Sequence, residues 1–194
     1  TAAEPAGDGV RISYERGGEA GSVEADAVLV AAGRAPNTDG LGLEATGVRT
    51  GEGGWIEVDE FLRTSHPDIY AYGDCIGTAM FKHTSSTEGR IAYRNAQGDR
   101  TPMSYRANPH AVFSEPEVAS VGLTERECRE QGLSYKAASV PYDGIAKGQI
   151  LGSPPGLAKA LVEEGSGRIL GFHIAGPHAA LLVQEVVVAM TLDA

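Results

Sequence analysis

The sequence predicts a mixed α/β (α+β) fold that ends in an antiparallel sheet with flanking helices. Three observations support this prediction. Residues 27–32 form a continuous apolar run, which is typical of a strand buried on both faces of a sheet. From Ala111 onward, short segments alternate in polarity with the period of antiparallel strands. Residues 124–131 and 178–190 instead resemble helices that cover a sheet.

The first predicted element is a hairpin. Residues 10–16 and 22–26 alternate in polarity around Gly17 and Gly18, which suit a tight turn. The hairpin leads into the apolar strand at 27–32. Nothing earlier in the sequence supplies the neighbours that a buried strand needs, so we expect the remnant of a larger domain.

Capping boxes predict the starts of two helices. Ser85 and Thr124 are each followed three residues later by a glutamate, Glu88 or Glu127, and a glycine closes each segment. The last helical run, 178–190, is followed by no glycine cap and no closing element. We therefore expect truncation at this end as well.

Short alternating segments make up the predicted C-terminal sheet. Its strands are expected at 111–114, 117–121, 135–140, 157–162 and 168–174. The composition changes at Asn108 and Pro109, and the residue before a proline avoids helical geometry, so a domain boundary is expected there.

Charge and cysteine content exclude several classes of function. The net charge of −10, without a local basic patch, disfavours nucleic acid and anionic membranes as partners. The longest apolar run, 179–183, is far shorter than the roughly 20 residues of a membrane span. Cys75 and Cys128 lack the spacing of a disulfide or metal motif, so both are expected to be reduced thiols. We expect a soluble, cytoplasmic protein.

The most informative segment is 63–75, in which a predicted strand ends in Gly73 and Asp74. Glycine allows a cofactor to approach the backbone, and an aspartate at a strand's carboxyl end can accept hydrogen bonds from sugar or ribitol hydroxyls. The alternative is that Gly73 and Asp74 only form a turn.

Two other patterns are weaker. Residues 40–45 match G-x-G-x-x-A but do not follow a strand, as a phosphate-binding turn must. His173, His178 and Glu185 could be drawn as a metal or proton-relay cluster, but His173 belongs to a strand and His178 opens a helix. Core or capping roles are favoured.

Several motifs together resemble the class I pyridine nucleotide-disulfide oxidoreductases, which include dihydrolipoamide dehydrogenases and the glutathione, mycothione and mercuric reductases. They occur in the family's order, at residues 31–37, 63–75, 109–118, 120–125, 169–179 and 184–185. The resemblance covers nearly the whole chain but separates the members of the class poorly.

The resemblance implies three domains and two cofactors. Residues 1–38 would be the end of an NAD-binding domain, 39–108 an FAD-binding segment and 109–194 a dimerisation domain. The implied FAD-binding residues are Gly73, Asp74, Met80, Phe81, Lys82 and His83. The implied NAD-binding residues are Ala31, Ala32, Gly33 and Arg34. The family usually has alanine in place of Lys82, and His83 could instead simply flank the helix predicted at Ser85.

The implied parent enzyme transfers hydride between NAD(H), flavin and a redox disulfide, with lipoamide the favoured substrate. It would be a homodimer that serves a lipoyl-bearing complex. The chain lacks the family's C-x4-C pair, its two G-x-G-x-x-G turns and its catalytic His-Glu pair, so we assign no catalytic residue and expect the chain alone to be inactive. The alternative is a non-catalytic homodimerisation module.

Overall fold

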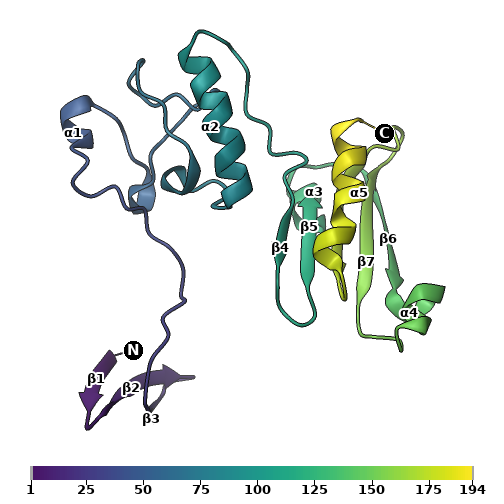
Figure 1. Ribbon diagram of the computed structural model, residues 1–194, viewed down its shortest axis with the longest axis horizontal. Coiled ribbons are helices and arrows are strands. Elements are labelled where there is room, and N and C mark those ends of the chain that lie inside the picture. Colours follow the sequence, from purple (N-terminus) through teal and green to yellow (C-terminus); the bar gives the residue numbers. More distant parts are fainter. Residues whose placement is uncertain (1, 194) are drawn as a thin grey trace. The chain divides into compact units, whose positions relative to one another are not determined.

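The computed structural model describes residues 2–193 and divides into two compact units, Thr1–Ala35 and Pro36–Ala194 (Figure 1). The first unit is an antiparallel sheet of β1 (Ala2–Ala6), β2 (Gly9–Arg16) and β3 (Glu19–Ala25). The predicted hairpin is confirmed as β2 and β3, whereas β1 was not predicted.

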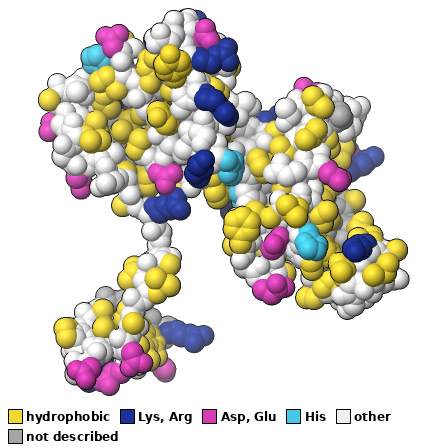
Figure 2. Space-filling view, viewed as in Figure 1, with side chains coloured by type: hydrophobic (Ala, Val, Ile, Leu, Met, Phe, Trp, Pro, Cys, Tyr) yellow, Lys and Arg dark blue, Asp and Glu magenta, His cyan; other side chains and the backbone are white. Residues whose placement is uncertain are grey.

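The predicted strand at 27–32 is wrong. These residues are extended but unpaired, and Leu29 and Val30 are 91% and 81% exposed. Hydrophobic side chains accordingly lie at the surface of the segment that leaves the small sheet (Figure 2). An apolar run forms a buried strand only when neighbouring strands pair with it, and no described segment does so.

The second unit begins with short elements around a small core. They are α1 (Leu43–Thr46) and two 3-10 turns, η1 (Glu52–Gly54) and η2 (Gly73–Ile76), followed by the longer helix α2 (Lys82–Ala96). The buried apolar residues of this core are Val48, Ile56, Leu62, Ala71, Ile76 and Ala92. The predicted strand before Gly73 is wrong, because only a single bridge between Arg63 and Tyr70 forms there.

Helix α2 corrects the predicted capping box at Ser85. The helix begins at Lys82, so the N–H of Ser85 already donates to the carbonyl of Phe81 (2.9 Å) within the first turn. Glu88 turns inward and binds donors from other segments, so it is not available to cap the helix. The box at Thr124 is confirmed, with Thr124 and Glu127 bonded reciprocally at the start of α3.

Five antiparallel strands form the C-terminal sheet, in the order β4-β5-β8-β7-β6. They are β4 (His110–Val112), β5 (Val118–Gly122), β6 (Tyr135–Pro141), β7 (Leu157–Glu163) and β8 (Ile169–Ala175). Every strand predicted here is confirmed. The accompanying helices are α3 (Glu125–Glu130), α4 (Ala146–Ile150) and α5 (Ala179–Thr191), with a 3-10 turn η3 (Tyr142–Gly144).

Helix α5 lies across one face of this sheet (Figure 1). Ala179, Val183 and Met190 are buried against Ala119 and Val121 of β5, which closes an apolar core. Among the described residues, 2–193, no helix is long and apolar enough to cross a bilayer.

Candidate flavin-binding site

The Gly73–Asp74 motif lies in the turn η2, at the surface of the second unit. Gly73 has φ +78°, a region that favours glycine, and its peptide is buried while Asp74 is exposed. The turn closes when the N–H of Gly77 donates to the carbonyl of Asp74 (3.1 Å). A short carboxylate thus lies at the surface on a hydrogen-bonded turn.

The predicted segment 80–83 forms the start of α2. Phe81 is the N-cap residue, and its side chain makes no capping hydrogen bond to the first N–H groups of the helix. Such a helix end attracts an electron-rich ligand atom. His83 lies in the first turn rather than before the helix, and its Nε2 donates to the carbonyl of Pro109 (2.8 Å).

Aromatic rings lie beside this helix start. The Phe81 ring stacks with the rings of His83 and His110, at centroid distances of 5.7 and 5.6 Å. Partial burial, and then the nearby His173 and His83 rings, lower the pKa of His110, so its imidazole is neutral near pH 7. The contributions of Pro109 and His110 were not predicted, since they depend on contacts between distant segments.

The turn η2 and the start of α2 pack against each other. A Cβ placed on Gly73 would lie 3.1 Å from Oγ of Ser85, and the N–H of Gly73 donates to Glu88 (2.7 Å). The structure therefore brings the predicted residues Gly73, Asp74 and 80–83 together.

This arrangement fits a flavin nucleotide. Asp74 is a carboxylate that can accept from ribitol hydroxyls, Gly73 allows close backbone approach, and the start of α2 carries N–H groups that Phe81 does not cap. Lys82 is exposed, and its backbone can serve in the same way as that of alanine. The roles of the individual residues remain predictions.

The predicted NAD loop lies in the other unit. Ala31, Ala32, Gly33 and Arg34 are exposed, and no other described residue of the chain comes within 4 Å of the position that a Gly33 Cβ would take. NAD contact by these four residues therefore stays a prediction.

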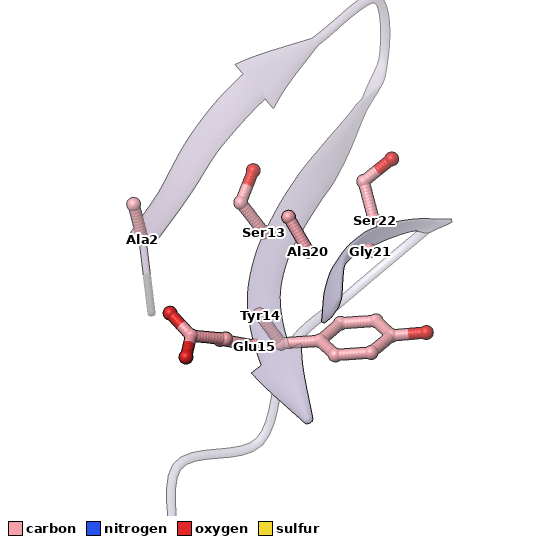
Figure 3. A pocket seen from close by; sticks show the side chains of 7 residues that line it. All are labelled: Ala2, Ser13, Tyr14, Glu15, Ala20, Gly21 and Ser22. Atoms are coloured by element: carbon pink, nitrogen blue, oxygen red, sulfur yellow. The ribbon is translucent and has the colours of Figure 1, made fainter. Parts of the chain in front are cut away.

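A shallow depression of about 670 Å³ on the small sheet carries no comparable chemistry (Figure 3). The ring of Tyr14 lies over its cross-strand partner Gly21, where a Cβ would be only 2.8 Å away. The remaining lining is small residues and the lone carboxylate of Glu15, so no set of charged groups converges there.

The weaker patterns form no site. Residues 40–45 lead into the four-residue helix α1 without a preceding strand. His173 is bonded to Ser120 and to the carbonyl of Leu123 (both 3.0 Å), whereas His178 is the N-cap residue of α5. No described group of three or more His, Cys, Asp or Glu residues could hold a metal ion.

Both cysteines are free thiols in the structure. Burial raises the pKa of the Cys75 thiol, and the Glu88 and Asp74 carboxylates add to this effect although backbone hydrogen bonds oppose it. Cys75 is therefore protonated at neutral pH and is not an activated nucleophile.

Comparison with known proteins covers nearly the whole chain. Residues 1–92 match the family described as "Pyridine nucleotide-disulphide oxidoreductase", and residues 108–194 match its dimerisation domain. Dihydrolipoyl dehydrogenase of Geobacillus stearothermophilus is 39% identical over 97% of the chain. A mitochondrial dihydrolipoyl dehydrogenase of Arabidopsis thaliana is 38% identical over 98%. The chain spans 40% and 38% of the lengths of these two relatives.

Solved structures give the same result. LpdA from Mycobacterium tuberculosis superimposes with a TM-score of 0.87 at 28% identity, over 99% of this chain and 41% of its own. The HOCl-induced flavoprotein disulfide reductase RclA from Escherichia coli superimposes with a TM-score of 0.76 at 28% identity. The match covers 95% of this chain and 42% of the RclA chain. Fold, motif order and both family matches agree: the chain belongs to the pyridine nucleotide-disulphide oxidoreductase family.

Proposed function

We propose that this chain is the C-terminal part of a dihydrolipoyl dehydrogenase, in which it supplies part of the FAD site and a homodimer interface. The observation that carries the proposal is the 39% identity to a dihydrolipoyl dehydrogenase along 97% of the chain. The packing of the turn that carries Asp74 against α2 supports the FAD assignment.

The residues of the chain would hold the cofactor rather than react. Asp74 would accept hydrogen bonds from ribitol hydroxyls, and the first N–H groups of α2 would face polar atoms of the ring system. His83, held by the Pro109 carbonyl, would keep a fixed orientation beside it. FAD, when bound, supplies a two-electron relay between nicotinamide and a redox disulfide.

Activity assays test the proposal at two levels. The 194-residue chain should show no turnover with NADH and lipoamide, because Cys75 and Cys128 cannot form the C-x4-C pair of the reaction. Turnover by a homogeneous preparation would contradict this expectation.

The substrate is tested with the longer protein that carries the chain. We expect its kcat/KM for dihydrolipoamide to exceed those for oxidised glutathione, mycothiol disulfide and Hg(II) by at least about tenfold, or about 1.4 kcal/mol. A smaller margin would favour one of the other reductases of the family. NAD is proposed over NADP, and a cytoplasmic lipoyl-bearing complex is the proposed partner.

Exposed apolar side chains of the C-terminal domain support the proposed dimer. The large ones on α5 and around β4 and β5 are Leu181, Leu182, Val188, Val112, Phe113 and Val118. Met190 of the same helix instead packs into the core of its own domain, and Val186 and Val187 pack against that core. Such a surface is typical of an interface between subunits.

Sedimentation tests the dimer. The protein should sediment as a dimer at micromolar concentration, and Leu181→Asp should shift it toward the monomer, since Leu181 is 72% exposed on α5. Leu41→Asp is the matched control, because Leu41 is 61% exposed outside this domain. A monomeric wild-type protein would contradict the proposal.

A further inference from the structure

The buried face of α2 is unusual in being largely polar. Its four buried residues are Thr84, Glu88, Ala92 and Asn95, which the helical period places on one face. A buried polar side chain destabilises the fold unless it is hydrogen-bonded, and a buried charge does so far more strongly. The polar residues on this face must therefore have specific partners.

Glu88 has two such partners from segments far apart in sequence. Glu88 as a whole is only 1% exposed to solvent. One carboxylate oxygen accepts the N–H of Gly73 (2.7 Å) and the other accepts the hydroxyl of Tyr105 (2.7 Å). Within residues 2–193, no cation forms an ion pair with Glu88.

The hydroxyl of Tyr105 remains a hydrogen-bond donor to Glu88. Burial, and then the hydrogen bond to Glu88, raise the pKa of Tyr105 well above its ordinary value. The phenol keeps its proton across the physiological range, so the carboxylate is held from one side by Tyr105 and can hold the Gly73 peptide on the other.

Gly73 needs an external constraint. Its φ of +78° and its missing side chain leave the peptide before Asp74 more conformational freedom than other residues would have. Ser85 and Glu88 lie one helical turn apart on α2: a Cβ placed on Gly73 would come 3.1 Å from the Ser85 Oγ, and Glu88 accepts the Gly73 N–H. The bond from Gly73 to Glu88 thus fixes the turn relative to the start of α2.

We infer that Glu88 is a positioning residue, whose hydrogen bond to the Gly73 N–H sets the separation between the Asp74 turn and the 80–83 segment, the two parts of the flavin site. This inference rests on the proposed FAD site. It does not require Glu88 to touch the cofactor.

Amide exchange in the 194-residue protein without FAD tests the inference directly. The Gly73 N–H should be protected in the wild type, and Glu88→Ala should speed its exchange at least about tenfold, as measured by NMR. Asn95→Ala is the matched control, because Asn95 is a buried polar residue of the same helix face that bonds Phe61 and Thr101 instead. Unchanged Gly73 exchange in Glu88→Ala would overturn the inference.

FAD affinity of the longer protein, measured by flavin fluorescence, gives the second readout. Glu88→Ala should weaken FAD binding at least about tenfold, whereas Glu88→Gln should stay within about threefold, because the amide oxygen can still accept from Gly73. Equal losses in both variants would overturn the positioning role. Wild-type protein that binds no FAD would instead refute the proposed function and leave the exchange result standing.

The wild type alone is decisive if Glu88→Ala does not fold. A protected Gly73 N–H would support the inference, and exchange at the rate of an unstructured peptide would overturn it.

Discussion

Helices α2 and α5 are buried in opposite ways. The buried face of α2 carries Thr84, Glu88 and Asn95, which are all hydrogen-bonded, whereas that of α5 carries Ala179, Val183 and Met190. Apolar packing stabilises without strong directionality, while hydrogen bonds demand defined angles and distances. The α5 face therefore stabilises through apolar packing, and the α2 face through directional hydrogen bonds.

The largest effect is expected from the apolar face. Met190→Ala should lower the free energy of unfolding by about 2–5 kcal/mol, because Met190 is 2% exposed and the core would keep a cavity. Chemical denaturation followed by circular dichroism measures this loss. Leu41→Ala, at an exposed site, should change it by less than about 0.5 kcal/mol. A similar loss in both variants would contradict the assignment of this core.

Substitution by leucine, at a similar side-chain volume, compares the tolerance of the buried faces of α5 and α2. Met190→Leu should cost less than about 1.5 kcal/mol, since apolar atoms replace apolar atoms. Asn95→Leu should cost about 1–3 kcal/mol, because it leaves the carbonyls of Phe61 and Thr101 and the N–H of Thr101 without their side-chain partner. The same denaturation experiment compares them. If Asn95→Leu were tolerated as well as Met190→Leu, the proposed contrast between the faces would fail.

The smallest effect concerns the cap of α3. Thr124→Ala should destabilise by about 1 kcal/mol at pH 7. Hydrogen bonds from Thr124 lower the pKa of Glu127, so the stability linked to its charge is present above the ordinary pKa of about 4.3 and is lost as pH falls through the lower folded value. The difference between wild type and Thr124→Ala should therefore shrink as the pH falls through the lowered pKa of Glu127. A difference that grows in acid would contradict this linkage.

The two capping boxes show where prediction from sequence ends. Thr124 and Glu127 bond each other, so the local pattern was sufficient. Ser85 and Glu88 have the same spacing, but Glu88 accepts hydrogen bonds from Gly73 and Tyr105 instead. The proximity of these two residues depends on tertiary structure. The C-terminal strands were predictable because alternation is local. The apolar run at 27–32 was not, because a strand also needs partners.

Some residues of the candidate site could be predicted from the sequence and others could not. Asp74 and residues 80–83 were identified from motifs, and the packing of η2 on α2 places them together. Tyr105 and His110 could not be identified, because no local pattern marks the residue that will support a turn or stack on a ring.

The extended run at 27–32 has a practical consequence for the purified chain. No backbone hydrogen bond joins it to another described segment, and its apolar side chains are exposed. Such a segment can pair with the same segment of another molecule and so nucleate open-ended aggregates. Light scattering that rises steadily with concentration would reveal this self-association, which unlike a two-fold dimer has no fixed stoichiometry.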